Sequence, residues 1–594
     1  MNNNIKNPLV FLTRMLWRYS AGNRRMVVLY AAMSVAGNLI WSLEPLVVGL
    51  LLNEVQTKGV SEANTGYLIL LLLAFLMVDV VSWGFHGPAR VLEMKNAFFV
   101  KANYKKALLE GTMGLPIEWH VDHHSGDTID KIEKGSNALF SFSENTFQVI
   151  QAVTVLVAGV VAMFYYNPTA TVAVLALTIP TFFVLIIFDR KLVPGYKKVS
   201  LLENETSAKV FDIISNVTTV IILRIEPLVM KALDTAIMKP FRQFFANAKL
   251  NEVKWFSASV LGRLAAIAVI GIYLAQQLAG GVVLVGTLYI LYGYVDRIRS
   301  VFFQFAYLYS DIVIYRARVS NAEELSKQFQ AKRNSVENRI SKTWNKLEIK
   351  NLSFSYGEEQ TLHLSGISME ITKGERIAVI GESGGGKSTF LKVMRDLYHP
   401  KTLTLSVDGI ELPEGFSAIE NSISLVPQDP EIFSTTVREN ITVGVEYPET
   451  HIAIFTGIAQ FSDVVQRLPK GLESSIVEKG VNLSGGEKQR LALARGLLAS
   501  EHKDIILLDE PTSSVDFANE LKIYERLFEA FPDKSIISSI HRLHLLPMFN
   551  TIYLFKEGRI VAAGSFEHLK NDSPEFKELW ERYLKAQASH GISS

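Results

Sequence analysis

The stretch that decides the fold of the second half of the chain lies at residues 376–393 and reads RIAVIGESGGGKSTFLKV. An apolar, strand-like run at 376–380 leads into a glycine-rich loop that fits the pattern G-x-x-x-x-G-K-[ST], and a helical run follows. Glycines in such a loop let backbone N–H groups close around phosphate oxygens at a helix N-terminus, where the helix dipole favours anions. The stretch therefore predicts a phosphate-binding loop between a strand and a helix.

The side chains of this loop have expected tasks. We expect Lys387 to reach the β- and γ-phosphates of a bound nucleotide, and the Ser388 hydroxyl to ligate Mg²⁺. The loop residues expected to bind the nucleotide are Gly381, Ser383, Gly384, Gly386, Lys387, Ser388 and Thr389.

A second apolar run, at 505–508, ends in Asp509 and Glu510. A carboxylate at the end of a strand beside the phosphate loop can hold Mg²⁺ or its water shell, and the next carboxylate can polarise an attacking water. Alone, Asp-Glu after a strand is more often a strand-terminal turn, but here it is the partner that a phosphate loop requires. We therefore expect Asp509 to be a metal ligand and Glu510 to activate water.

Residues 483–490 read LSGGEKQR and resemble the signature of the ATP-binding cassette (ABC) family, and the resemblance covers essentially the whole chain. In that family this segment closes over ATP bound to the partner protomer. The resemblance therefore implies that Ser484, Gly485 and Gly486 bind nucleotide, and that a chain with one copy of each motif pairs with a second chain, most simply another copy of itself.

Other positions resemble family motifs one by one. Tyr356 is similar to the aromatic residue that stacks on adenine, with an edge-strand aromatic as the alternative; Gln428 is similar to the glutamine that contacts Mg²⁺. Asp516 fits the loop that links two ATP sites, His541 the histidine that contacts the γ-phosphate, and Val477–Gly480 a loop that touches the opposite protomer. The resemblance implies ATP and Mg²⁺ as cofactors, Ser388, Gln428 and Asp509 around the metal, and a catalytic set of Glu510, His541, Lys387 and Gln428.

Six runs in the first half of the chain are long and apolar enough to span a bilayer, which takes about 20 residues each. They lie at 26–52, 66–87, 146–166, 169–189, 257–279 and 287–308. Long, charged, helix-prone stretches separate the second run from the third and the fourth from the fifth. Lys and Arg concentrate before the first run and between the second and third, which predicts that both termini are cytoplasmic.

The composition fits a membrane part joined to a soluble part. The 594 residues are 48% hydrophobic, and the mean hydropathy of +0.20 averages an apolar first half with a second half typical of α/β proteins. The net charge of +1 argues against a nucleic-acid binder. The absence of cysteine excludes disulfides and zinc–thiolate sites, whether it is natural or engineered. No cleavable signal peptide is recognisable, and residues 8–19 have the composition of an interfacial helix.

We therefore expect a polytopic α-helical membrane domain with six transmembrane helices and long intracellular extensions, followed by an α/β P-loop ABC ATPase domain. The expected boundaries are an N-terminal interfacial (elbow) helix at 1–25, an ABC exporter transmembrane domain at 26–320, a linker at 321–345 and a nucleotide-binding domain at 346–594.

Residues 115–127, midway between the second and third runs, resemble the first coupling helix of ABC exporters, and the second coupling segment is expected near 211–224. The first segment contains His120, Asp122, His123 and His124, which also suggest a metal site. A surface helix that docks onto the ATPase domain explains these residues without an ion, and we favour that interpretation.

Ionisable residues within the spans are functional candidates by default. Counting along the runs places Glu44, Asp79, Arg263 and Asp296 at similar depths. They either face a water-filled substrate cavity or pair between helices, for instance Glu44 or Asp79 with Arg263. Several aromatic residues carry a similar choice between helix packing or lipid contact and a drug pocket: Trp41, Trp83, Phe302, Phe303, Phe305, Tyr307 and Tyr309.

The sequence is best interpreted as a homodimeric type IV ABC exporter that moves a multidrug, lipid or peptide-like substrate by alternating access. The expected setting is the lipid bilayer of a bacterial plasma (inner) membrane, with no nucleic-acid partner. The alternatives are a dedicated lipid or lipid-linked oligosaccharide flippase, a subunit of a heterodimer, and a regulatory or channel-like ABC protein. No N-terminal peptidase domain is recognisable, which weakens a role in processing leader peptides.

Overall fold

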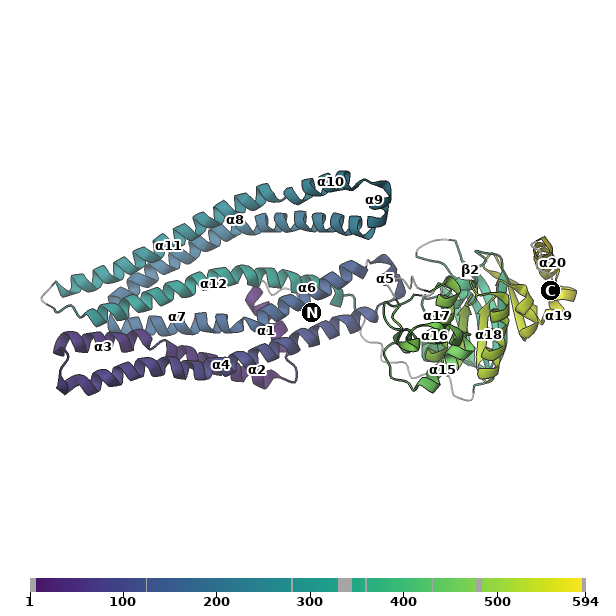
Figure 1. The fold of residues 1–594 in the computed structure, drawn as a ribbon, viewed down its shortest axis with the longest axis horizontal. Helices are drawn as coiled ribbons and strands as arrows, with labels where there is room; N and C mark the ends of the chain where they lie inside the picture. The colour runs from purple at the N-terminus through teal and green to yellow at the C-terminus, as the bar shows by residue number, and fades with distance from the viewer. Residues whose placement is uncertain are drawn as a thin grey trace. The chain divides into compact units, whose positions relative to one another are not determined.

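The computed structural model describes residues 7–123, 125–278, 281–329, 344–357, 361–429, 431–476 and 483–589. The chain divides into two compact units. The first holds residues 7–113 and 125–329 and is helical, whereas the second holds residues 114–123 and the described residues from 344 onward and is built around two β-sheets (Figure 1).

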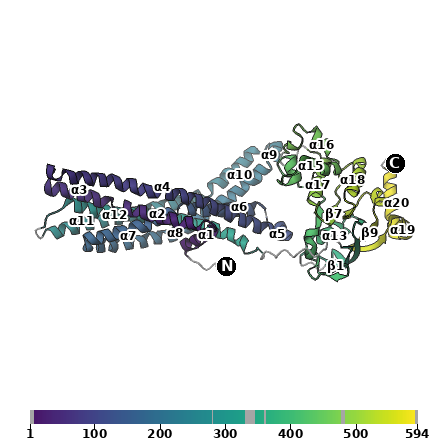
Figure 2. The same cartoon turned by 90° about the horizontal axis from the view of Figure 1, so that it is seen from below.

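The helices of the first unit are long and run roughly along one direction (Figure 1). Their bounds are α1 (Pro8–Tyr19), α2 (Arg24–Trp41), α3 (Glu44–Lys58), α4 (Glu62–Met113), α6 (Ser125–Glu144), α7 (Thr146–Tyr166), α8 (Pro168–Ser215), α9 (Val217–Leu223), α10 (Glu226–Met238), α11 (Phe241–Gln277) and α12 (Val285–Ser326). Helices α8 and α11 lie side by side and are joined through α9 and α10 (Figures 1 and 2).

Five of the expected spans fall in helical segments that are long and apolar enough to cross a membrane. Among the described residues these segments are Arg24–Lys58, Glu62–Met113, Ser125–Tyr166, Pro168–Ser215 and Glu226–Gln277. The sixth expected span, 287–308, lies in α12 and does not reach the same apolarity, because Asp296, Arg297 and Arg299 fall within it. These half-buried charges are paired, Arg297 with Glu44 and Arg299 with Asp296, and α12 packs against α3 and α7.

The first span is interrupted, which the expectation of one run at 26–52 missed. Helix α2 ends at Trp41 and α3 begins at Glu44, with Pro45 in its first turn. Proline lacks an N–H group and is tolerated in a first turn, where that N–H would have no helical partner. The break therefore has a local cause in the sequence, and it leaves carbonyls at the end of α2 that need donors.

Helix α12 supplies those donors. The Arg297 guanidinium donates to the Trp41 carbonyl at 2.8 Å, and the Tyr294 hydroxyl donates to the Ser42 carbonyl at 2.9 Å. Arg297 also pairs with Glu44 at 2.5 Å and lies over the Trp41 ring, 4.0 Å from its centre. Because lipid offers no hydrogen bonds, a broken span is stable only when protein groups satisfy its backbone.

A second interruption, between α6 and α7, is satisfied in the same way from α4. Arg90 donates to the Glu144 carbonyl at the end of α6 at 2.5 Å, and the Phe147 N–H at the start of α7 donates to Glu93 at 2.7 Å. Arg90 and Glu93 also pair with each other, and Glu93 is buried. One ion pair thus serves a carbonyl on one side of the break and an N–H on the other.

The second unit contains a short helix, α5 (Ile117–Asp122), within the expected first coupling segment. His123 stacks on Trp119 with ring centres 4.2 Å apart and contacts its carbonyl at 2.8 Å. His124 lies outside the described residues, and no group of three or more metal-ligating side chains occurs within the described ones. In the first unit, α9 occupies the expected second coupling segment and exposes apolar side chains such as Ile222.

The rest of the second unit carries two sheets. An antiparallel sheet has the order β2 (Leu364–Thr372), β1 (Lys346–Phe354), β4 (Thr402–Val407) and β5 (Ile410–Glu411). A second sheet has the order β10 (Arg559–Gly564), β9 (Thr551–Lys556), β3 (Arg376–Gly381), β8 (Ser535–Ser539), β7 (Ile505–Asp509) and β6 (Ile423–Val426). Its strands are parallel except for the edge strand β10.

The larger sheet separates two hydrophobic cores. On β7, Ile506 and Leu508 belong to one core, whereas Ile505 and Leu507 belong to the other, as the alternation of side chains along a strand requires. The helices around the sheets are α13 (Lys387–Met394), α14 (Val437–Thr442), α15 (Glu449–Ile458), α16 (Ser462–Arg467), α17 (Gly485–Ala499), α18 (Phe517–Ala530), α19 (Phe566–Asp572) and α20 (Pro574–Ser589).

The interrupted first span yields a stability prediction. Arg297→Met should remove the donor to Trp41 and leave Glu44 without its partner, which lowers the free energy of unfolding by about 1–3 kcal/mol. The measurement is the thermal midpoint of the purified chain in detergent. The matched control is Arg263→Met on α11, where the arginine is exposed. Equal midpoints for the two variants would contradict the role of Arg297.

Candidate nucleotide site

The register of the parallel sheet brings the candidate residues to one edge. Gly381, at the end of β3, pairs with Phe555 on β9, while Val379 on β3 pairs with Ser539 on β8. Ser539 pairs in turn with Asp509 at the end of β7. The carboxyl ends of parallel strands meet at one edge of a sheet, which is where such proteins bind ligands.

The loop between β3 and α13 has the glycine conformations that phosphate binding requires. Gly384 and Gly386 have φ of 80° and 100°, in the left-handed region that side chains disfavour. A Cβ at Gly386 would lie 3.0 Å from the Leu364 side chain and 3.2 Å from the His363 carbonyl. The sequence GESGGGK therefore forms a tight loop that ends directly at the first turn of α13.

Lys387 folds back over this loop. Its ammonium donates to the carbonyls of Gly381 at 2.9 Å and Glu382 at 3.1 Å. Burial lowers the pKa of Lys387, and the carboxylates of Glu510 and Asp509 act in the opposite direction. The lysine is thus a buried cation placed between the loop carbonyls and two acidic residues.

Two of the three residues expected around the metal, Ser388 and Asp509, are in contact, whereas the third, Gln428, contacts Glu510. The Ser388 hydroxyl donates to Asp509 at 2.9 Å, and the Ser539 hydroxyl donates to the same carboxylate oxygen at 2.9 Å. Asp509 is 3% exposed. A hydroxyl oxygen and a carboxylate oxygen are ligand types that Mg²⁺ prefers, so these residues fit the ion. Ser539 is a partner that the sequence motifs did not indicate.

Glu510 is the meeting point of the expected catalytic side chains. Gln428 donates from its amide nitrogen to Glu510 at 2.8 Å, and the His541 ring lies 2.7 Å from the other carboxylate oxygen. The Glu510 N–H donates to the Ser539 hydroxyl at 3.0 Å. Two side chains from separate segments, Gln428 and His541, therefore converge on the Glu510 carboxylate, whose side chain is 10% exposed.

Tyr356 lies beside the phosphate loop. Its hydroxyl is 3.3 Å from the Thr389 hydroxyl, and its ring meets those of Phe354 and Tyr398 edge to face, with centres 4.9 Å and 5.1 Å away. Burial raises the pKa of Tyr398, and Tyr356 and the Glu118 carboxylate on α5 raise it further. The aromatic cluster that includes Tyr356 is therefore close enough to α5 for the Glu118 carboxylate to act on Tyr398.

The signature segment begins helix α17. Ser484 caps this helix by accepting a hydrogen bond from the Glu487 N–H at 3.3 Å, while Glu487 accepts one from the Ser484 N–H at 2.8 Å. This reciprocal pair is a capping box. A Cβ at Gly486 would lie 2.7 Å from the Ser514 carbonyl, so glycine is required there for packing. Ser484 and Gly485 are exposed.

Asp516 caps helix α18 and accepts a hydrogen bond from the Asn519 N–H at 3.0 Å. That bond holds the pKa of Asp516 below its usual value. The expected loop Val477–Gly480 lies outside the described residues. The nucleotide-binding residues expected from the sequence thus divide between the phosphate loop and the exposed signature end of α17, with Asp516 on a third loop.

The charged membrane residues separate into two kinds. Glu44 and Asp296 line a cavity of about 380 Å³ together with Trp41, Tyr292 and Arg297. Asp79 and Arg263 are exposed on their helices and do not line it. The expected pairing of Glu44 with Arg263 is wrong, because Arg297 on α12 takes that place, and Asp296 pairs with Arg299 at 2.5 Å.

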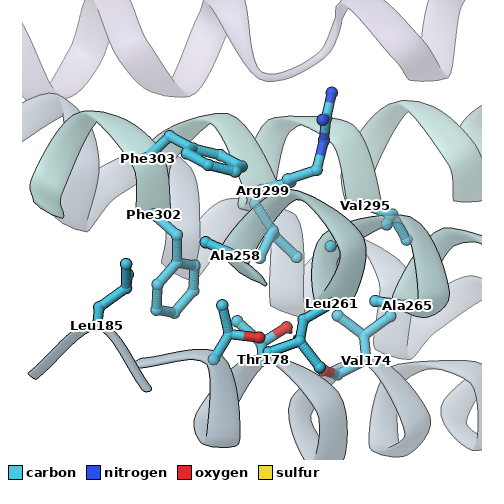
Figure 3. Close-up of a pocket in the computed structure, with 13 residues that line it drawn as sticks. Val174, Thr178, Leu185, Ala258, Leu261, Ala265, Val295, Arg299, Phe302 and Phe303 are labelled. Carbon is cyan, nitrogen blue, oxygen red and sulfur yellow. Dashed lines mark hydrogen bonds between the residues drawn. The ribbon is translucent and has the colours of Figure 1, made fainter. Parts of the chain in front are cut away.

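A second, apolar pocket lies among α8, α11 and α12 (Figure 3). Phe302 and Phe303 contribute to it, and the Arg299 guanidinium points away from the other labelled side chains in Figure 3. Trp83 and Tyr307 do not line this pocket and are 66% and 67% exposed in the single chain. The aromatic residues thus divide between pocket lining and exposed positions.

Comparisons with known proteins agree with this architecture. The family model for the ABC transporter transmembrane region matches residues 27–295, and the model for the ABC transporter domain matches residues 364–513. The chain therefore belongs to the ABC transporters, as a membrane domain fused to a nucleotide-binding domain.

Individual relatives narrow the class. The chain is 26% identical over 486 residues to ATP-binding cassette sub-family B member 6 of Mesocricetus auratus, covering 80% of this chain and 56% of that protein's length. It is 26% identical over 549 residues to the ATP-dependent permease MDL2, mitochondrial, of Saccharomyces cerevisiae, covering 88% of this chain and 70% of that protein. The chain is thus similar to a member of sub-family B and to a mitochondrial permease, and it spans little more than half the length of the first of these relatives.

A solved structure titled as a bacterial Atm1-family ABC exporter with ATP bound aligns with a TM-score of 0.77 at 21% identity. The alignment covers 94% of this chain and 99% of that one. At this identity the likeness establishes the fold, which is that of an Atm1-like exporter.

The contacts of Asp509 predict its role in metal-dependent binding. Asp509→Asn should weaken binding of Mg²⁺-ATP by about 10–100-fold, because the Ser388 hydroxyl loses its charged acceptor and the ion loses a carboxylate. Titration calorimetry with and without Mg²⁺ measures this. Ser539→Ala, which removes one hydrogen bond to Asp509, is the milder control. An unchanged Mg²⁺ dependence in Asp509→Asn would remove this residue from the metal site.

Proposed function

We propose that the chain hydrolyses ATP and uses it to export or flip a substrate across the membrane by alternating access, as a dimer with two ATP sites at the interface. The observation that carries the proposal is the convergence of Gln428 and His541 on Glu510, next to the contact between Ser388 and Asp509. This is the set of side chains that phosphoryl transfer to water needs.

The chain's own residues divide the reaction between them. Phosphoryl transfer asks the protein mainly for positioning and charge neutralisation. Lys387 and the N–H groups of the loop neutralise the phosphates, while Glu510 orients and polarises the attacking water. Gln428 and His541 hold that carboxylate from both sides. Mg²⁺, held by Ser388 and Asp509 with Gln428 nearby, would supply additional positive charge at the phosphates.

Pairing of two copies is supported by the exposed signature end of α17. Ser484 and Gly485 stand at a helix N-terminus, where N–H groups and the dipole favour an anion. In the proposed dimer they bind the γ-phosphate of the ATP held by the partner's phosphate loop. Closure of the two ATPase domains then moves the membrane helices through α5 and α9.

The proposed cargo enters the cavity that contains Glu44, Asp296 and Arg297, where aromatic rings stand beside charged groups. Such a lining suits amphipathic cargo of the multidrug, lipid or peptide-like kind. We place both termini in the cytoplasm, on the Lys and Arg excess in the connections expected on that side. The membrane proposed for the protein is a bacterial plasma membrane.

The proposal predicts a separation of ATP binding from hydrolysis. Glu510→Gln should keep the contact with Gln428 and bind ATP within about threefold of the wild type, while turnover falls at least 100-fold, because the amide cannot polarise water. ATPase activity and ATP binding are measured on the full chain in nanodiscs. Full ATPase activity in Glu510→Gln would refute the assignment.

A matched control is Glu525→Gln, an exposed glutamate on α18 that should leave turnover unchanged. Light scattering of the detergent-solubilised Glu510→Gln chain with ATP adds an independent result. A mass twice that of the protein chain supports a homodimer, whereas a chain that stays single with ATP bound would contradict pairing with itself.

A further inference from the structure

The signature helix α17 carries a buried glutamine to which the sequence motifs give no task. Gln489 follows the capping Ser484 by five residues and is 7% exposed. Burying a side-chain amide costs free energy unless its donors and acceptor are satisfied. The hydrogen-bond partners of Gln489 therefore show which parts of the protein this side chain joins.

Those partners lie in two loops of the nucleotide site. The Gln489 amide nitrogen donates to the Ser513 hydroxyl at 2.6 Å and to the Gln428 carbonyl at 3.4 Å. Its amide oxygen accepts from the Ser514 N–H at 2.7 Å. Gln428 itself donates to Glu510 at 2.8 Å. One side chain thus links the signature helix to the segment after Glu510 and to the loop that positions Glu510.

The segment after Glu510 is also held from its other side. Arg542, which follows His541, donates to the Val515 carbonyl at 2.7 Å and to Glu520 at 3.0 Å. The 513–516 loop therefore lies between Gln489 on the signature helix and Arg542 next to His541. A displacement of either neighbour would strain these hydrogen bonds, because hydrogen bonds are directional.

We propose that Gln489 is a positioning residue that couples the signature segment to Gln428 and Glu510. The inference rests on the proposed function, in which Ser484 serves the ATP of the partner while Gln428 and Glu510 serve the chain's own ATP. Engagement of Ser484 by the partner's nucleotide shifts the first turns of α17, and Gln489 carries that shift to the chain's own site. Each ATP then adjusts the geometry that hydrolyses the other, and such coupling is reciprocal for binding.

The first test separates positioning from simple stability. Gln489→Leu removes all three hydrogen bonds at similar volume. Its matched control is Ser500→Ala at the far end of the same helix, where a buried hydroxyl donates to Ser424 at 2.7 Å. We expect kcat for ATP to fall at least tenfold in Gln489→Leu, with KM within threefold and a thermal midpoint near that of Ser500→Ala. An unchanged kcat would overturn the proposal.

A second variant at the same position provides a test if Gln489→Leu does not fold. Gln489→Glu keeps the shape of the side chain and the acceptor for the Ser514 N–H but cannot donate to Ser513 or Gln428. It should also reduce kcat at least threefold with KM nearly unchanged. Normal turnover in this folded variant would equally overturn the proposal.

The decisive experiment asks whether Ser484 and Gln428 communicate through Gln489. Ser484→Ala, Gln428→Ala and the double variant are compared, first with Gln489 present and then in the Gln489→Leu background. The kcat of each is measured with radiolabelled ATP, which detects slow hydrolysis. We expect the effects on kcat to depart from additivity at least threefold with Gln489 present and to become additive without it. Additivity in both backgrounds, or the same departure in both, would overturn the coupling.

Failure of the proposed function would look different. A wild-type chain without ATPase activity would refute ATP hydrolysis itself, whereas an active wild type with additive effects refutes only the role of Gln489.

Discussion

The hydrogen bond from the Ser388 hydroxyl to the Asp509 carboxylate joins the phosphate loop to the strand that carries Glu510. Ser388 lies in α13, directly after the loop that follows β3, and Asp509 is the last residue of β7. Strands β3 and β7 are not neighbours, because β8 lies between them. Ser539 at the end of β8 completes the link by donating to Asp509 and accepting from the Glu510 N–H. The parallel register of three strands therefore determines where a phosphate, a metal ion and an attacking water can meet.

A different constraint applies to the membrane unit. Backbone N–H and C=O groups that water cannot reach must form hydrogen bonds within the protein. Two interruptions, after Trp41 and after Glu144, are each satisfied by an arginine from a neighbouring helix, Arg297 and Arg90. Each arginine also pairs with a carboxylate near the break. Charged residues within the spans that suggested substrate binding thus form ion pairs within the helix bundle. Glu44 and Asp296 also line the cavity.

Local motifs were the most predictable part of the molecule. The phosphate loop, Asp509 and Glu510 were recognisable because their chemistry depends on spacing along the chain, and the structure brings Gln428 and His541 to the same carboxylate. The fused membrane and ABC domains were likewise expected, and the family comparisons confirm them. The roles of these residues in catalysis remain predictions that the variants above test.

The interactions that sequence reasoning missed all join distant segments. The break at 42–43 has a local signal in Pro45, but its partner Arg297 lies more than 250 residues away. Counting depth along the spans pointed to Arg263 instead. Ser539 lies outside the quoted motifs, and Gln489 lies within the signature stretch 483–490, where the resemblance gives it no task. Their contacts arise from strand order and from helix α17 packing against two loops, which the spacing of residues along the chain does not encode.

The central claim is that two copies of this chain enclose ATP between the phosphate loop of one and the signature of the other. The sequence contains no cysteine, so introduced cysteines can form a disulfide only with each other. Ser383→Cys and Ser484→Cys, both exposed positions, are introduced separately into two differently tagged chains that also carry Glu510→Gln, and the co-expressed chains are oxidised with and without ATP. The account predicts a disulfide between the two chains that forms with Mg²⁺-ATP and is weak without it. No cross-link, or one that forms equally without ATP, would contradict the account.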